Sequence, residues 1–198
     1  MLTVDVQSQY DFLSEDYAKL FAQSGATAFQ HPIWLDVFYR RLPQQRGAQP
    51  VIVTVHEGDE LLGVVPLIRR NRLGIVMIEP HNLGVTDYAA PVLSPHLLRK
   101  PTVESALPEL MAQALGRHDL VRILPVRPEH MEDWTLLFPG DPVPVDFSAH
   151  AVGLSEPMDR WRETHVDRKL SSQYRRKAKR WCNQHEVDIR RLTDAADE

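Results

Sequence analysis

"PVIVTVHEGDELLGVVPLIRR", residues 50–70, is the clearest structural element in the chain. Two runs rich in Val, Ile and Leu, which favour strands, flank Glu57-Gly58-Asp59. Gly and Asp favour a tight turn. Strand-forming runs on both sides of a short turn are typical of a β-hairpin. The stretch therefore predicts two antiparallel strands joined by that turn.

The sequence on either side of the hairpin alternates between helical and strand patterns. Helices are expected over residues 14–25, 31–42, 105–116, 128–138, 156–166 and 167–181, and strands over 74–80, 120–126, 145–154 and 186–192. Residues 84–94 read as a loop or irregular strand. This order predicts an α/β (α+β) domain with a mixed, largely antiparallel sheet and helices packed on it.

Two of the helices have clear signals at their ends. Ser14 is a good N-cap for the first, and Pro32 suits the first position of the second. On the second helix, Trp34, Val37, Phe38 and Leu42 are expected to share one apolar face.

Composition excludes several classes of protein. The chain has 198 residues, 43% hydrophobic and 25% charged, with a net charge of −4, which argues against a general nucleic-acid binder. One cysteine, Cys182, excludes an internal disulfide framework and a multi-cysteine zinc site, and we expect it to be a small core residue. With no secretory signal and no apolar run long enough to span a membrane, a cytoplasmic, bacterial-type protein is expected.

Motifs for phosphate, metal or covalent chemistry are absent from the sequence. "QALGRH" at 113–118 has the outline of a pyrophosphate-binding turn, but Gly116 is expected to close a helix rather than open one. His31, His81, His96 and His118 lie near predicted turns, where surface or capping roles are expected. We expect no metal site, and the sequence identifies no catalytic residue.

One loop stands out. Asn82, Gly84, Asp87 and Tyr88 lie between predicted strands in a glycine-containing segment. Such loops commonly carry function, and Asn and Asp equally commonly bond their local backbone in turns. Both interpretations stay open.

A second stretch, "DRKLSSQYRRKAKRW" at 167–181, holds seven basic residues and one acidic residue. On a helical wheel Leu170, Tyr174, Ala178, Trp181 and Cys182 form an apolar stripe, through which we expect the helix to dock. The opposite face carries the candidate anion-binding residues Arg168, Lys169, Arg175, Arg176, Lys179 and Arg180, with Lys177 at the edge of the stripe. A solvated face, an anionic ligand or partner such as RNA, and a membrane-surface helix all stay open.

Thr193 and Asp194 are good N-cap residues, and "AADE" after them suits a first helical turn. Either a further helix begins here, in which case the chain is part of a longer protein, or the end is a polar tail.

An ordered set of segments resembles one family: "AFQHPIWLDVFYRRL", "LLGVVPLIRR", "HNLGVTDYAAPVL", "LVRILPV" and "LSSQYRRKAKRW". Together they resemble the front half of the FemAB-like branch of the GNAT acyltransferase superfamily, in particular its CelD-like (cellulose biosynthesis) acetyltransferases. The resemblance covers roughly residues 27–192, and its specificity lies in the order of the segments.

The resemblance implies two tandem GNAT-like folds. Residues 1–166 would be the first, and residues 167–198 would lead toward a second half. It further implies an acyl-CoA-dependent N-acyltransferase, in particular an acetyltransferase, in which the second half binds most of the acetyl-CoA or other acyl-CoA. This chain would then be the acceptor-side scaffold.

In that arrangement Trp34, Asp87 and Tyr88 would lie near the substrate cleft, and the 168–180 helix would form its cationic rim. The acceptor would be an amine, either a small molecule or one from a polysaccharide pathway. The alternative is a non-catalytic domain that binds RNA, another anionic polymer or a protein partner through the 168–180 helix; the net charge makes nucleic acid the less favoured of these.

Overall fold

The structure is a computed structural model that describes residues 1–99, 101–143 and 157–184. The chain divides into two compact units, residues 1–143 and 144–198. The sheet lies in the first unit, and the second contains α6 (Met158–His165) and α7 (Arg168–Gln184). The expected boundary after residue 166 stays a prediction.

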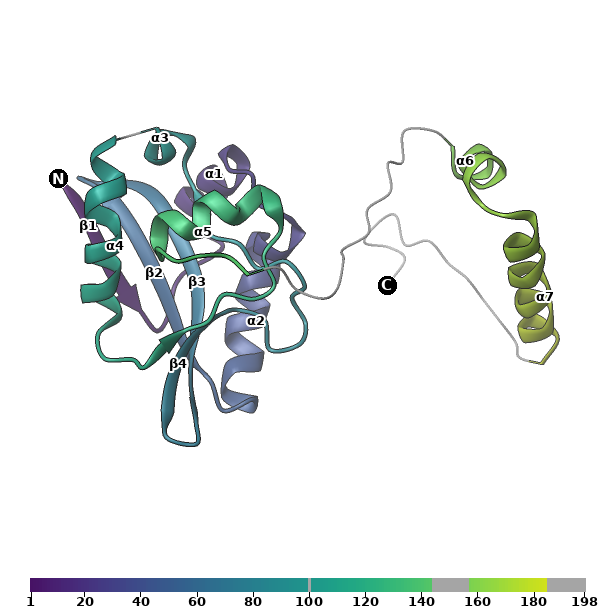
Figure 1. The fold of residues 1–198 in the computed structure, drawn as a ribbon, viewed down its shortest axis with the longest axis horizontal. Coiled ribbons are helices and arrows are strands. Elements are labelled where there is room, and N and C mark those ends of the chain that lie inside the picture. Colours follow the sequence, from purple (N-terminus) through teal and green to yellow (C-terminus); the bar gives the residue numbers. More distant parts are fainter. Residues whose placement is uncertain (100, 144–156, 185–198) are drawn as a thin grey trace. The chain divides into compact units, whose positions relative to one another are not determined.

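A six-stranded mixed sheet is the centre of the first unit (Figure 1). Its strands are β1 (Leu2–Gln7), β2 (Gln49–Glu57), β3 (Glu60–Arg72), β4 (Ile75–Pro80), β5 (Val92–Leu93) and β6 (Leu120–Val121). The order is β1-β2-β3-β4-β6, with β5 paired to β3, and the one parallel pair is β4 with β6. The predicted α/β class with a largely antiparallel sheet is therefore confirmed.

Helices cover both faces of this sheet (Figure 1). They are α1 (Glu15–Gln23), η1 (Ala28–Gln30), α2 (Pro32–Gln45), α3 (Pro95–Leu98), α4 (Pro101–Leu115), η2 (Pro128–His130) and α5 (Met131–Leu137). The predicted caps are confirmed, since the Ser14 side chain accepts from Tyr17 N and Pro32 begins α2. Gly116 follows α4 with φ +62°, the left-handed conformation of a helix-closing glycine.

The predicted hairpin is confirmed, and it is buried on both faces. Val51, Val53 and Val55 of β2 pack in the core under α4 and α5, whereas Ile52 packs with Val64 under α1 and α2. Because each face meets helices, these strands are almost continuously apolar instead of alternating with polar residues.

A bulge near the turn changes the register of β2 and β3. Val55 pairs with Gly63 and His56 with Leu61, so Leu62 is the extra residue on β3. A Cβ on Gly63 would lie 3.0 Å from Leu93 Cδ2, in the strand that pairs beside it. Glycine at 63 therefore allows β5 to approach β3 closely.

The expected apolar face of α2 was partly wrong. Leu35 and Phe38 are the residues that face the core, whereas Trp34 and Val37 are exposed. Leu42 is half-buried, as the row Leu35, Phe38, Leu42 at spacings of three and four would require.

The strand expected over 120–126 is shorter than its apolar run suggests. Only Leu120 and Val121 pair with β4, although Arg122 N also donates to Ile78 O at 2.9 Å. Pro125 has no N–H with which to continue the ladder. The strands expected over 145–154 and 186–192, and the helix start at 193–194, lie outside the described residues.

The predicted basic helix is confirmed as α7, and the docking of its apolar stripe stays a prediction. No described α7 side chain is buried, and Cys182 is exposed instead of lying in a core. The hydrophobic pattern identified the helix and its stripe, and it could not show whether anything covers the stripe.

Candidate functional site

An aromatic cluster forms where η1 and α2 meet the loop after β4. The Phe29 ring lies edge-on to Trp34, with centroids 5.8 Å apart, and to Tyr88, with centroids 6.1 Å apart. We call Phe29, Trp34 and Tyr88 the aromatic cluster. Trp34 is 37% exposed and the other two are half-buried, so the cluster lies at the surface of the first unit.

Buried hydrogen bonds hold the backbone behind this cluster. Gln30 Nε2 donates to Tyr88 O at 3.1 Å, and Tyr17 Oη donates to Gln30 O at 2.7 Å. The Gln30 Oε1 atom accepts from Thr27 N and Thr27 Oγ1, which completes a capping box at the start of η1. The loop at 88 and the turn at 30 are thus tied to each other directly.

His81 also holds the backbone behind the aromatic cluster. Its Nε2 lies 3.1 Å from Phe29 O, and its Nδ1 lies 3.1 Å from Pro66 O. The ring is fully buried against Phe38, with centroids 5.5 Å apart. Burial lowers the pKa of His81 to about 4, so the imidazole is neutral at pH 7. A neutral ring donates to only one of the two carbonyls.

Pro66 explains why His81 fits at this point. Proline in a central strand cannot donate to a neighbour, and Pro66 lies between the residues of β3 that pair with β5 and those that pair with β4. Its carbonyl accepts from His81 N at 3.3 Å as well as facing the ring. The gap left in the ladder is thus filled by a side chain, which contradicts the expected surface or capping role of His81.

The loop from 82 to 88 combines local turn bonds with one unusual group. Asn82 Oδ1 accepts from Gly84 N at 2.7 Å, which confirms the turn interpretation for Asn82. The Thr86 hydroxyl is buried and has no hydrogen-bond partner among the described residues. Asp87 is exposed, and within those residues it forms no hydrogen bond or ion pair.

Arg127 completes the site from a distant part of the chain. Its guanidinium carbon lies 5.4 Å from the centroid of the Tyr88 ring, in a cation–π contact, and its Nη2 lies 3.1 Å from Glu129 Oε1. A neighbouring pair, His130 Nδ1 and Asp133 Oδ2, lies 3.2 Å apart in the first turn of α5.

Of the residues predicted from sequence, Trp34 and Tyr88 come together through Phe29. Asp87 directly precedes Tyr88 in the chain. Their role in a substrate cleft stays a prediction. The six predicted anion-binding residues all belong to α7, in the second unit. Sequence reasoning missed Phe29, Gln30, His81 and Arg127. Only the position of Phe29, five residues before Trp34 at the start of a helix, could have suggested one of them.

His81 does not provide acid–base chemistry at this site. His81 has both ring nitrogens against carbonyl oxygens and no access to solvent, so it cannot serve as a base. Within residues 1–99, 101–143 and 157–184, no group of three or more His, Cys, Asp or Glu side chains could hold a metal ion. In the same ranges no helix is long and apolar enough to cross a bilayer.

The start of α3 and the turn at 113–118 do not offer a cradle for an acyl-CoA pyrophosphate. Such a group needs free backbone N–H groups at the start of a helix that follows a strand. At the start of α3 (Pro95–Leu98) the Ser94 side chain already accepts from His96 N, and this helix is only one turn long. The turn at 113–118 closes α4.

No protein-family model and no curated protein matches the chain. Among solved structures, the chain is similar to the crystal structure of a ribosomal-protein-alanine N-acetyltransferase from Brucella melitensis biovar Abortus 2308. The identity is 17%, the match covers 76% of this chain and 99% of that chain, and the TM-score is 0.42. A similarity this distant defines neither a family nor a chemistry for the chain.

Proposed function

We propose that the chain is the acceptor-side half of an acyl-CoA-dependent N-acyltransferase. The proposal rests on the ordered resemblance to CelD-like GNAT proteins, together with the observation that Phe29 joins Trp34 and Tyr88 into one exposed aromatic cluster. The acyl-CoA donor is then bound chiefly by a second GNAT-like half, as that resemblance implies.

The aromatic cluster suits an amine that arrives protonated. An ammonium group is attracted to the faces of Trp and Tyr rings, and a carboxylate nearby adds to that attraction. Trp34 supplies an exposed ring and the exposed Asp87 supplies the charge, whereas the Tyr88 ring already contacts the Arg127 guanidinium. A sugar-like acceptor from a polysaccharide pathway would in addition cover apolar ring surface, so we favour an amino sugar or another small amine.

Within such an enzyme this half binds and orients the acceptor. The bound ammonium first loses its proton to water. When bound, acyl-CoA supplies the thioester carbonyl that the free amine attacks; the amide bond forms as the C–S bond breaks, and CoA leaves as its thiol. The cluster fixes the amine in place and excludes water, and fixing the reactants in this way is a large part of catalysis for a reaction without a covalent intermediate. Gln30 and His81 do not contact the acceptor themselves. They position the cluster by holding the backbone carbonyls of Tyr88 and Phe29.

Titration calorimetry with acetyl-CoA tests whether acyl-CoA binding belongs to a second half and not to this chain. The chain alone is expected to give no binding heat and no release of free CoA in the presence of amines. Tight binding of acetyl-CoA, or turnover by residues 1–198 alone, would overturn the scaffold role.

A nuclear magnetic resonance screen with amines, including glucosamine, tests the acceptor site. Shifts are expected at the Trp34 indole and the Tyr88 ring, and Trp34→Ala should weaken binding about tenfold. Ile33→Ala is the matched control, because Ile33 is the exposed neighbour on α2. Equal losses in both variants would contradict a specific role of the cluster.

A further inference from the structure

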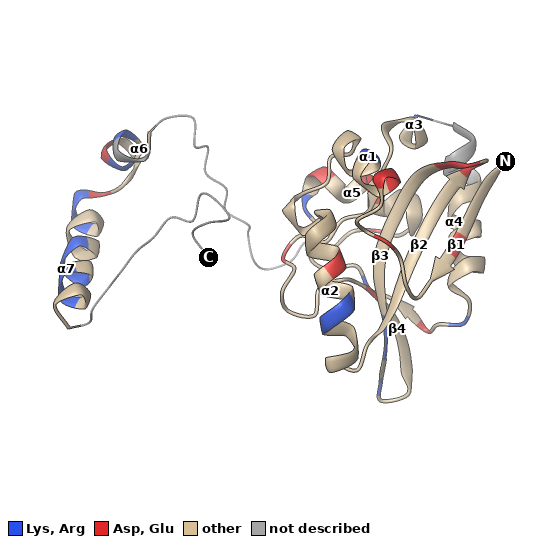
Figure 2. Ribbon diagram, turned by 180° about the vertical axis from the view of Figure 1, so that it is seen from behind, with Lys and Arg blue, Asp and Glu red and all other residues tan. Residues whose placement is uncertain are grey.

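The α7 helix is charged in an unusual way. Seven of its residues are Lys or Arg, and residues 168–184 contain no Asp or Glu. Ordinary solvated helices mix charges of both signs, with acidic and basic residues three or four positions apart. Figure 2 shows the result as a helix whose coloured residues are all blue, in contrast to the mixed surface of the first unit.

None of these seven basic side chains forms an ion pair or a side-chain hydrogen bond with any described residue. The acidic residue nearest the helix, Asp167, is engaged elsewhere. Its Oδ1 accepts from Lys169 N at 2.5 Å and Leu170 N at 3.4 Å, so it caps the start of α7. Among the described residues of the second unit, no acidic side chain therefore neutralises the cationic face.

Repulsion along the helix makes an anionic partner favourable. Arg175 and Lys179, and likewise Arg176 and Arg180, are four positions apart, where like charges destabilise a helix. An anionic surface would remove that repulsion in addition to attracting each charge.

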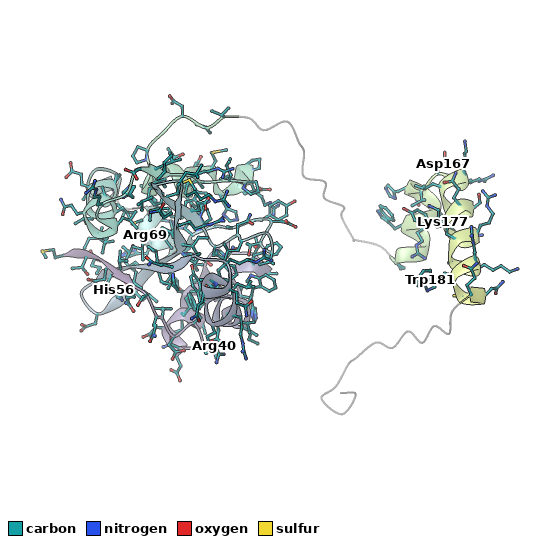
Figure 3. All side chains as sticks on the ribbon, turned by 90° about the horizontal axis from the view of Figure 1, so that it is seen from below. Arg40, His56, Arg69, Asp167, Lys177 and Trp181 are labelled. Atoms are coloured by element: carbon teal, nitrogen blue, oxygen red, sulfur yellow. The ribbon has the colours of Figure 1, made fainter. Side chains whose placement is uncertain are left out.

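The opposite side of α7 is apolar. Leu170, Tyr174 and Trp181 are 45%, 63% and 59% exposed, and with Ala178 they occupy about 80° of the helix circumference. The stripe from Leu170 to Trp181 is roughly 16 Å long at 1.5 Å per residue. Asp167, Lys177 and Trp181 follow one another along this helix in Figure 3.

We propose that α7 binds the surface of an anionic lipid bilayer. The apolar stripe would enter the interface between headgroups and acyl chains, and the flanking rows of Arg and Lys would meet lipid phosphates. A bilayer is the partner that uses both sides of α7 at once. Each Lys or Arg near an anionic surface contributes attraction, and seven of them compensate for a stripe with only one large aliphatic residue.

RNA fits the same helix less well. Proteins that bind single strands place aromatic side chains among the basic ones on one face, so that bases stack while phosphates are paired. In α7, Tyr174 and Trp181 lie on the side opposite Arg176 and Lys179. A nucleic acid on the cationic face would leave the stripe exposed.

The test is flotation of the full chain with lipid vesicles at about 0.1 M salt. We expect binding to vesicles of phosphatidylcholine and phosphatidylglycerol in about equal parts, and none to phosphatidylcholine alone. Arg175→Glu with Arg176→Glu should reduce binding at least tenfold. Arg72→Glu with Arg117→Glu makes the same change in net charge at exposed sites of the first unit and should leave binding unchanged.

The stripe is tested separately with Leu170→Ser and Trp181→Ser, which keep every charge. This variant should bind anionic vesicles about tenfold more weakly. The tryptophan emission of the parent chain should shift to shorter wavelength on vesicles, and that shift should be absent in Trp181→Phe. Circular dichroism should show a gain in helix when vesicles are added.

Several outcomes would overturn the proposal. Failure of the chain to float with anionic vesicles is one. Full binding by the stripe variant is another, because it would show that charge alone binds the vesicles and that the stripe does not enter the bilayer. A third is tight binding of a single-stranded RNA of about 20 nucleotides without vesicle binding. None of these measurements involves acyl transfer. A negative result would therefore overturn membrane binding by α7 and leave the proposed acyltransferase function unaffected.

Discussion

At the scale of single residues, His81 links the sheet to the aromatic cluster. Its ring fills the break that Pro66 leaves in β3 and holds the carbonyl of Phe29, whose own ring contacts Trp34 and Tyr88. The residue type was visible in the sequence, but its burial was not. Only the paired strands and η1 define the space into which it fits.

The burial of His81 makes the stability of the fold depend on pH. Its pKa is lowered from 6.5 to about 4 in the folded chain, whereas the unfolded chain takes up a proton near 6.5. As pH falls from about 6.5 to 4, the unfolded state therefore binds more protons and the free energy of unfolding decreases. The loss from this group is about 3 kcal/mol, complete below pH 4.

Urea titrations at a series of pH values measure this effect. His81→Gln, which cannot protonate, should show a flatter dependence between pH 4 and 6.5 than the parent chain. The nitrogen chemical shifts of His81 in the parent chain provide a second measurement that needs no variant. A shift change centred near pH 6.5 would contradict the buried, neutral imidazole.

Leu73 offers a stabilising substitution. It lies in the two-residue turn between β3 and β4 with φ +54°, next to Gly74 with φ +86°, and it is fully exposed. A left-handed leucine costs roughly 1–2 kcal/mol, and Asn is favoured at this position of such hairpin turns. Leu73→Asn is therefore expected to raise the free energy of unfolding by about 1 kcal/mol.

Thermal unfolding measures this change. Leu73→Val is the opposite control and should destabilise the fold, because a β-branched residue adopts positive φ even less readily. No difference between the Asn and Val variants would contradict the strained turn.

At the scale of elements, periodicity and caps predicted most helices and strands. Ser14, Pro32 and Gly116 begin or end helices as expected, and the hairpin turn lies where Gly58 and Asp59 indicated. These features are local, because they depend on backbone preferences of neighbouring residues. Which side of a helix meets the core is not local, and the expected face of α2 was accordingly in error.

The packing of α4 against the sheet should carry much of the stability of the first unit. Leu107 is fully buried in the core that also contains Val65 and Ile78. Leu107→Ala removes buried apolar surface and leaves a cavity, and we expect a loss of about 2–5 kcal/mol.

Denaturant unfolding gives the loss, with Leu98→Ala as the matched control because Leu98 of α3 is 45% exposed. That control should change stability by less than about 0.5 kcal/mol. A similar loss in both variants would contradict the assignment of α4 to the core.

At the scale of the whole molecule, the three buried clusters draw all their residues from the first unit. Residues 1–143 expressed alone are therefore expected to unfold cooperatively, within a few degrees of the main transition of the full chain. Calorimetry of the two proteins compares them directly. A fragment that is unfolded at 25 °C would show that the second unit is needed for the first to fold.

The sequence by itself determined the fold class, the hairpin, most helix ends and the amphipathic pattern of α7. All of these follow from side-chain size, charge and backbone preference over a few residues. The tertiary structure alone decided that Phe29 joins Trp34 to Tyr88, that Arg127 lies over Tyr88 and that His81 fills the gap at Pro66. Those contacts depend on the register and packing of distant strands, which no local pattern encodes.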